Sequence, residues 1–109
     1  MIDMYEQYIK EREGAKLYKD ERGFFTYRID YSTFQVNDLF VLPEYRSTKA
    51  SKEFAKKIDD LAVEHRCEKI FCTTCTDANN WQKSEHYILK NGYEFITEIG
   101  NMKYYVKEL

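Results

Sequence analysis

The apolar run Leu39-Phe40-Val41-Leu42 is the feature that most constrains what this chain can fold into. The segment of residues 33–42 begins with alternating polar and apolar side chains and ends apolar on both faces. Strands that are covered on both faces of a sheet read as continuous apolar runs. Pro43 follows, and proline has no N–H to donate to a sheet. We therefore expect a central, doubly covered strand that ends at Pro43.

Three segments have the apolar spacing of helices. Residues 49–65 carry apolar side chains at intervals of three and four, as on a helix face that packs against a core. Residues 81–90 read as a second helix, and Asn91-Gly92 provides its C-terminal stop. Residues 3–13 read as a third helix with one apolar stripe, and Gly14 follows it. The apolar positions are Ala50, Phe54, Ile58, Leu61 and Ala62 in the first, and Met4, Tyr5, Tyr8 and Ile9 in the last.

The remaining segments read as strands. Residues 15–19, 24–31, 69–76, 93–99 and 102–106 have strand composition, and Gly100-Asn101 between the last two predicts a hairpin. The order is therefore helix, three strands, helix, strand, helix, two strands. This order predicts an α/β (α+β) fold with a mixed sheet and helices on its faces. A chain of 109 residues has room for one core, so we expect a single domain over residues 1–109.

Composition excludes several classes of protein. The 17 Lys and Arg against 19 Asp and Glu argue against a protein that grips nucleic acid through its net charge. No apolar run approaches the length of a membrane-spanning helix, and the first residues do not resemble a signal peptide, so we expect a cytoplasmic protein. Three cysteines suit a reducing compartment. Cys72 and Cys75 fall on a predicted strand, where they point to opposite faces, so we expect no metal site.

The loop after Pro43 can bind an anion. A strand ends, a short loop follows and a helix begins, so the first N–H groups of that helix point at the loop. Arg46 lies in the loop, and Lys49, Lys52 and Lys56 form a basic wall along the helix. Ser47 or Thr48 can cap the first turn. The pattern predicts a pyrophosphate cradle, and the alternative is an ordinary helix start with a solvated lysine face.

Two segments together resemble the GCN5-related N-acetyltransferase (GNAT) superfamily over about residues 15–106. Val41-Leu42-Pro43-Glu44-Tyr45-Arg46 is similar to the family's approach to its pyrophosphate loop. Asn79-Asn80, Ser84 and Asn91-Gly92-Tyr93 are similar to its later helix. The resemblance implies a mixed, mostly antiparallel central sheet flanked by helices. The chain also has the look of small bacteriophage-type members.

The resemblance also implies a function and a set of site residues. It implies acetyl transfer from acetyl-CoA, as cosubstrate, to an unidentified amine on a protein or small molecule. The backbone of Leu39, Phe40 and Val41 would hold the pantetheine and polarise the thioester carbonyl. Asp38, whose pKa burial would raise, would be the base, with Glu44 as the weaker choice, and Tyr87 would be the acid. The other implied contacts to the cofactor are Arg46, Ser47, Thr48, Lys49, Ala50, Ser51, Asn80 and Ser84.

The sequence departs from the family's pattern in three places. Lys49 stands where the first loop glycine is usual, and Ser51 stands where the last Gly or Ala is usual. Ile88 occupies the usual tyrosine position, beside Tyr87. The N-terminal part is shortened to one helix. These departures keep open a second hypothesis, in which a non-catalytic protein of this fold binds another protein.

Two further hypotheses concern partners. Residues 22–27 are similar to the opening of an RNA-binding strand, although the order of elements is wrong for that fold. An aromatic surface could instead serve a homodimer. Its members would be Tyr5, Tyr8, Phe24, Tyr27, Tyr104 and Tyr105.

Overall fold

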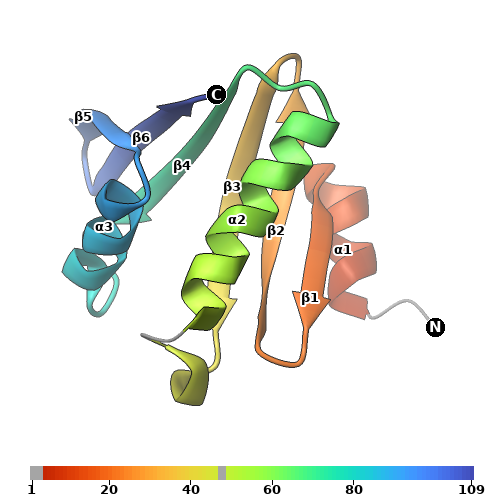
Figure 1. Cartoon of the computed structure of the whole chain (residues 1–109), viewed down its shortest axis with the longest axis horizontal. Coiled ribbons are helices and arrows are strands. Elements are labelled where there is room, and N and C mark those ends of the chain that lie inside the picture. The colour runs from red at the N-terminus through yellow and green to blue at the C-terminus, as the bar shows by residue number, and fades with distance from the viewer. Residues whose placement is uncertain (1–3, 47–48) are drawn as a thin grey trace.

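A computed structural model describes residues 4–46 and 49–109 (Figure 1). Every helix and strand expected from the sequence is present, within a few residues of its expected ends. A short 3-10 helix after the third strand is added. In order, the elements are α1 (Met4–Glu13), β1 (Lys16–Asp20), β2 (Gly23–Asp30), β3 (Thr33–Val41), η1 (Pro43–Tyr45), α2 (Lys49–Glu64), β4 (Lys69–Cys75), α3 (Trp81–Lys90), β5 (Glu94–Ile99) and β6 (Met102–Glu108).

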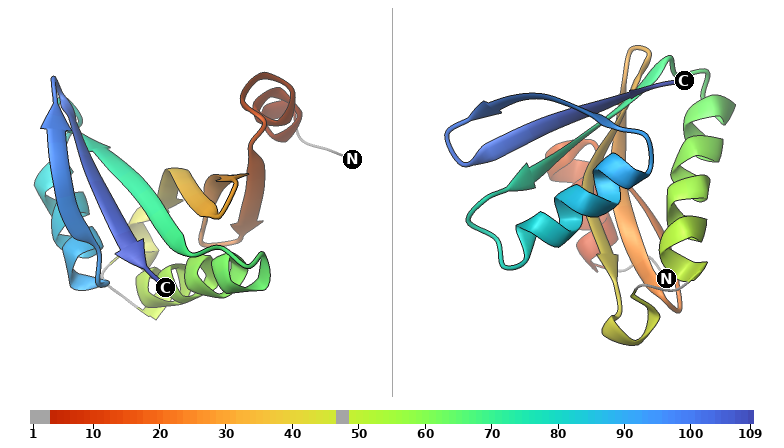
Figure 2. Two further views of the ribbon diagram at one scale, coloured as in Figure 1. Left: turned by 90° about the horizontal axis from the view of Figure 1, so that it is seen from above. Right: turned by 60° about the vertical axis from the view of Figure 1, so that its left-hand side comes forward.

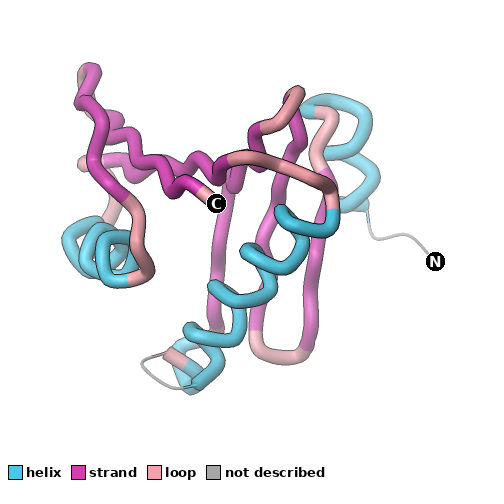
Figure 3. The backbone as a smooth tube through the Cα atoms, turned by 45° about the horizontal axis from the view of Figure 1, so that its top comes forward, coloured by secondary structure: helices cyan, strands magenta, loops and turns pink. Residues whose placement is uncertain are grey.

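The strands form one six-stranded sheet in the order β1-β2-β3-β4-β6-β5. Only β3 and β4 run parallel, and every other neighbouring pair is antiparallel. The expected mixed, mostly antiparallel sheet is therefore confirmed. The β1–β2 and β5–β6 hairpins lie at opposite ends of the sheet (Figure 3). The second turns at Gly100, whose positive φ of 60° suits glycine, so the predicted Gly-Asn hairpin is confirmed.

The main core lies between α2 and the central strands. Phe54 and Ile58 of α2 pack against Phe25, Phe34 and Ile70, which come from three neighbouring strands. The rings of Phe25 and Phe54 meet edge to face, with centroids 6.1 Å apart. Each buried side chain of this size contributes roughly 1.5–3 kcal/mol. The apolar stripe predicted for this helix is thus the one that holds it to the sheet.

Helix α1 lies on the opposite side of the sheet from α2 and α3 (Figure 2). Its predicted apolar stripe is mostly exposed: Ile9 is 1% exposed, whereas Met4 is 86% and Tyr8 is 55% exposed. The reason is position, because α1 packs mainly over β1, the edge strand, and only part of one helix face reaches the sheet. The predicted helix is present, but only Ile9 of its apolar stripe is buried.

The parallel strands β3 and β4 begin together and then diverge. They pair only from Thr33 to Gln35 of β3, and Figure 1 shows the gap widening toward the end of β3. Asn37 is an extra residue in β3, since its neighbours Val36 and Asp38 pair with consecutive residues of β2. Such a bulge bends a strand and increases its twist.

This divergence corrects the expectation of a doubly covered strand. Leu39 is 37% exposed and Phe40 is 42% exposed. The strand is central, but its second half has β2 on one edge and no strand on the other. The apolar run that begins at Leu39 is therefore not buried between two layers but borders an opening in the sheet.

Candidate functional site

A cleft of about 1340 Å³ lies where β3 and β4 separate. Its walls come from the second half of β3, the first half of α2, β4 and most of α3. Figure 2 shows α2 and α3 on the same side of the sheet, flanking the gap. The cleft is thus built by segments far apart in the sequence, and the splay of the two parallel strands creates it.

The open edge of β3 presents backbone groups to this cleft. The N–H of Leu42 donates to the carbonyl of Arg22 at 2.8 Å, on the β2 side. Because successive residues of a strand point their N–H and C=O to alternate edges, those of Leu39 and Val41 face the gap. The carbonyl of Val41 accepts a 2.7 Å hydrogen bond from Nε of Arg46. Leu39 and Val41 line the cleft, whereas the backbone of Phe40 faces β2.

Cationic side chains surround the cleft. Arg46, Lys52, Lys83 and Lys90 all line it. The predicted basic wall along α2 is reduced to Lys52. Lys56 bonds Asp60 at 2.7 Å and does not line the cleft.

The start of α2 lies at one end of the cleft. Ser51 lines it, the side chain of Ala50 is buried in the core, and Lys49 is exposed beside the opening without lining it. Ser47 and Thr48 lie outside the described residues. The first N–H groups of a helix have no intrahelical acceptor, and their partial positive charge adds to that of the lysines. This end of the cleft suits an anion.

Tyr87 connects the two helices across the cleft. Its hydroxyl donates a 2.5 Å hydrogen bond to the backbone carbonyl of Ser51 in the first turn of α2. Burial raises the pKa of the Tyr87 phenol to about 12, and the negative charge of Asp59 adds to the shift. The phenol therefore keeps its proton at neutral pH and is aimed at the end of the cleft where α2 begins.

Asp38 lies on the opposite wall, directly after the bulge. It is exposed, so the burial expected to act on its carboxyl group is absent. The Thr26 hydroxyl donates to the Asp38 carboxylate at 3.3 Å and accepts from the Asp38 N–H at 3.1 Å. These two bonds fix the residue at the edge of the cleft, which it lines. Glu44 is exposed in η1 and does not line the cleft.

Comparison with protein families decides the identity of this fold. Residues 2–93 match the model of the acetyltransferase (GNAT) family. The chain belongs to the GNAT family. No curated protein matches it in sequence.

Solved structures of acetyltransferases share the fold. An acetyltransferase of the GNAT family from Staphylococcus aureus Mu50 superposes with a TM-score of 0.73 at 19% identity, over 99% of this chain and 80% of that one. A Bacillus subtilis acetyltransferase in complex with CoA superposes with a TM-score of 0.73 at 11% identity, over 98% of this chain and 86% of that one. The PaiA N-acetyltransferase of Thermoplasma acidophilum, in complex with coenzyme A, superposes with a TM-score of 0.73 at 16% identity, over 81% of this chain and 54% of that one. The chain thus spans about half of that last protein.

The later GNAT motif is only partly placed at the cleft. Ser84 lines it, but Asn80 does not. Asn80 precedes α3 with a positive φ of 61° and makes no side-chain capping bond. Asn80 is exposed, and it lies between two residues that do line the cleft, Ala78 and Trp81.

Sequence reasoning missed the polar contacts that hold α3 on the sheet. Oε2 of Glu85 accepts hydrogen bonds from Tyr105 and Lys103 on β6, each at 2.5 Å. The Tyr105 hydroxyl also lies 3.0 Å from that of Thr74. The bond from Lys103 lowers the pKa of Glu85, with the Tyr105 bond adding to it. No local pattern signals these partners, because Glu85 lies on α3 and meets them only where that helix packs against β6.

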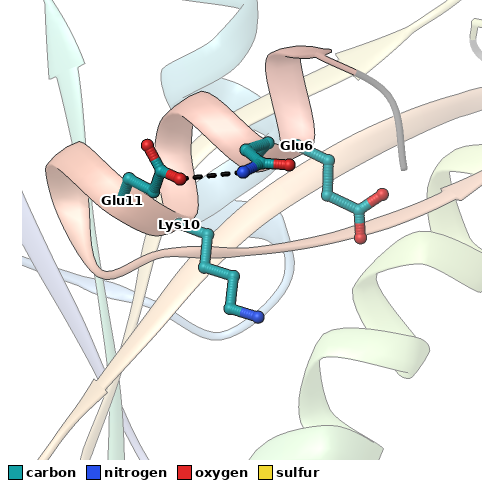
Figure 4. A pocket seen from close by; sticks show the side chains of 4 residues that line it. Glu6, Lys10 and Glu11 are labelled. Carbon is teal, nitrogen blue, oxygen red and sulfur yellow. Dashed lines mark hydrogen bonds between the residues drawn. The ribbon is translucent and has the colours of Figure 1, made fainter. Parts of the chain in front are cut away.

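Other candidate sites have ordinary structural explanations. A hollow of about 350 Å³ on α1 is lined by that helix alone and holds a Gln7–Glu11 hydrogen bond of 2.8 Å (Figure 4). In the RNA-binding pattern, Phe25 is fully buried, so it cannot stack on a base. Residues 4–46 and 49–109 hold no cluster of metal-ligating side chains, and none of their helices is long and apolar enough to span a membrane.

Proposed function

We propose that this GNAT protein is an N-acetyltransferase that moves an acetyl group from acetyl-CoA to an amine by direct attack. The observation that carries the proposal is the split between β3 and β4. One wall of the split is a strand edge whose backbone groups face the cleft, and four cationic side chains line the cleft. A ligand with a strand-like amide chain and several phosphates matches both features.

The residues present fit acetyl-CoA. The pantetheine amides would pair with the backbone of Leu39 and with the N–H of Val41, whose carbonyl accepts from Arg46. The phosphates would meet the start of α2, with Lys52 beside them and Arg46 at the end of β3. Lys83 and Lys90 of α3 complete the cationic rim. Lys49 does not line the cleft, so a lysine in place of the usual glycine leaves the cleft open.

Bound acetyl-CoA supplies a thioester, whose C–S bond breaks as the C–N bond to the amine forms. The N–H of Leu39 faces the cleft and is placed to stabilise charge on the carbonyl oxygen. Asp38 stands at the cleft edge as the acceptor of the amine proton. Tyr87 retains its phenolic proton, so it can return one to the leaving sulfur. Asn80 would contact acetyl-CoA only if the ligand extends beyond the residues that line the cleft.

The alternative is a non-catalytic GNAT-fold protein that binds another protein. The Tyr87 bond to Ser51 favours it, because a phenol held by a backbone carbonyl must give up that bond to serve as an acid. The same cleft would then be a remnant without cofactor affinity. Binding of acetyl-CoA separates the two readings.

The test is calorimetric titration with acetyl-CoA of the wild type and two matched variants. Lys52→Gln removes a charge from the cleft, and Lys56→Gln removes the same charge one turn further along α2, outside it. We expect micromolar binding that Lys52→Gln weakens about tenfold or more and Lys56→Gln leaves unchanged. Lys49→Glu, at the mouth, should also weaken binding. Absence of binding at millimolar acetyl-CoA would refute the enzyme and leave the protein-binding alternative.

Several finer expectations belong to the same proposal. Residues 1–109 would act as one acyl-CoA-binding domain, in the cytoplasm, and membership of a bacteriophage-type subgroup stays a prediction. The aromatic surface for a homodimer also stays a prediction, but two of the six residues proposed for it are excluded. Tyr27 and Tyr105 are buried within this chain and cannot form such a surface.

A further inference from the structure

The cleft is open to both faces of the sheet. Side chains along a strand alternate between its two faces, and the cleft is lined by both sets of β4. Cys72 and Thr74 point to the side of α2 and α3, whereas Thr73 and Cys75 point to the side of α1. A ligand in the cleft can therefore be reached from the α1 side. Asp38 lies at this passage, since it lines the cleft while bonding Thr26 on the α1 side.

An aromatic cluster lies on the α1 side next to Asp38. Phe24 and Phe40 are cross-strand partners with ring centroids 5.9 Å apart. Tyr5 of α1 meets Phe24 edge to face at 6.0 Å. Tyr5 and Phe40 are 39% and 42% exposed, so the cluster of Tyr5, Phe24 and Phe40 forms an accessible surface.

Charges of both signs lie beside this cluster, with Asp38 at the passage and Arg46 at the Phe40 ring. Asp38 pairs in the sheet with Thr26, two residues from Phe24 on the same face. Burial raises the pKa of the Tyr5 phenol, and the negative charges of Asp38 and Glu13 raise it further. Among residues 4–46 and 49–109, no ion pair involves Asp38. The Phe40 ring already accepts a cation, since the Arg46 guanidinium lies 5.4 Å from its centroid.

We propose that this surface binds the acceptor, and that the acceptor is a small primary amine carrying an apolar or aromatic group. The inference rests on the proposed function and names its substrate class. The ammonium would sit beside Asp38 at the passage, and the apolar group would lie on Phe24 and Phe40. Aromatic faces attract cations and apolar carbon alike. A polyamine fits less well, because its further charges would lie near the Arg46 guanidinium at the Phe40 ring.

The test measures binding of three probes by calorimetry and by amide chemical shifts in the isotope-labelled protein. The probes are 2-phenylethylamine, its neutral analogue 2-phenylethanol, and spermidine, a polycation that has no aromatic ring. We expect 2-phenylethylamine to bind at least about tenfold more tightly than either of the others. The shifted amides should include those of residues 24–26 and 38–40. Equal or tighter binding of spermidine, or shifts confined to other surfaces, would overturn the proposal.

Variants make the assignment specific. Asp38→Asn keeps the shape and removes the charge, and we expect it to weaken 2-phenylethylamine about tenfold without changing the affinity for 2-phenylethanol. Phe40→Leu should weaken both probes severalfold. Phe95→Leu makes the same change at an exposed ring on β5 and should weaken neither. Circular dichroism confirms that each variant is folded, and an Asp38→Asn protein that is folded and binds 2-phenylethylamine as the wild type does would refute the role of the carboxylate.

The outcome is separable from that of the proposed function. Acetyl-CoA binding depends on Lys52, on the far side of the sheet, and is measured on the same samples. If acetyl-CoA binds and 2-phenylethylamine does not, the acceptor class is wrong and the transferase proposal stands. If the amine binds and acetyl-CoA does not, the chain is an amine-binding protein and the transferase proposal fails.

Discussion

The hydroxyl of Tyr87 donates a 2.5 Å hydrogen bond to the backbone carbonyl of Ser51, and this bond joins the middle of α3 to the first turn of α2. The two helices flank the cleft, and α3 has no fully buried side chain of its own. Its position therefore depends on polar contacts at defined points. Tyr87 is one of them, and it lies where the cofactor phosphates would enter.

The first prediction concerns Tyr87→Phe, which removes only the hydroxyl. The Ser51 carbonyl lies inside α2, where a helical N–H remains as its partner, so we expect a loss of about 1 kcal/mol in the free energy of unfolding. In acetyl transfer we expect kcat to fall at least about tenfold with KM little changed, because the proton donor acts in the chemical step. Steady-state kinetics and urea unfolding measure the two effects.

The pH dependence of the wild type provides the control for that assignment. Because the pKa of Tyr87 is about 12, its ionisation should cause no loss of kcat between pH 7 and 10. A Tyr87→Phe protein with an unchanged kcat would show that the hydroxyl is structural and that solvent supplies the proton.

The second prediction concerns Glu85, the anchor of α3 on β6. Its pKa is lowered in the folded protein from an ordinary 4.5, chiefly by the bond from Lys103. A lowered carboxyl pKa adds stability that is present above the unfolded pKa and is lost as the pH falls through the folded one. We therefore expect Glu85→Gln to be destabilised relative to the wild type at pH 7, and the difference to be smaller at pH 3. Urea unfolding at both pH values tests this, and an equal difference at both would contradict it.

The elements of the fold were predictable because their signals are local. The spacing of Phe54, Ile58 and Ala62 identifies α2, and Gly100 marks the last hairpin. The splay of β3 from β4 was not predictable from composition. Leu39 and Phe40 have the apolar character of buried strand residues, and nothing nearby in the sequence indicates that β4 moves away from them. The opening depends on the bulge at Asn37 and on a partner strand that begins some thirty residues later.

The candidate site was predicted only in part, because motifs indicate some of its residues and contacts between distant segments determine the others. Arg46, Ser51 and Tyr87 were proposed from motifs, and all three line the cleft. Lys56 was included from helical spacing alone. It pairs with Asp60, one turn away, and does not line the cleft. Glu85 was missed because its partners come from a strand near the end of the chain.

The third prediction concerns the core beneath the cleft. Phe54 is 1% exposed and packs on Phe25, so Phe54→Ala leaves a cavity and should cost roughly 3–5 kcal/mol. Val63 on the same helix is 63% exposed, and Val63→Ala should change stability by less than about 0.5 kcal/mol. Thermal or urea unfolding compares the two. Similar losses for both would mean that α2 does not pack as described.

The fourth prediction concerns Gly23, which allows β2 to approach the functional end of β3. A Cβ atom at this position would lie 2.1 Å from the Phe40 carbonyl oxygen and 2.9 Å from Cα of Val41, and both neighbours are backbone. Gly23→Ala must therefore push the end of β3 away from β2. We expect it to cost roughly 1–3 kcal/mol in stability and to weaken acetyl-CoA binding, because Leu39 and Val41 move with the strand.

Gly100→Ala is the matched control for Gly23→Ala. Gly100 has a positive φ of 60° and open space around it, so its replacement strains the backbone without a steric clash. We expect Gly100→Ala to lower stability by about 1 kcal/mol and to leave acetyl-CoA affinity unchanged, since the β5–β6 turn lies outside the cleft lining. Calorimetric titration of both variants, compared at equal folded fraction, distinguishes a local effect on β3 from a general loss of stability. If the two variants bind acetyl-CoA equally well, the close approach at Gly23 does not position the binding edge.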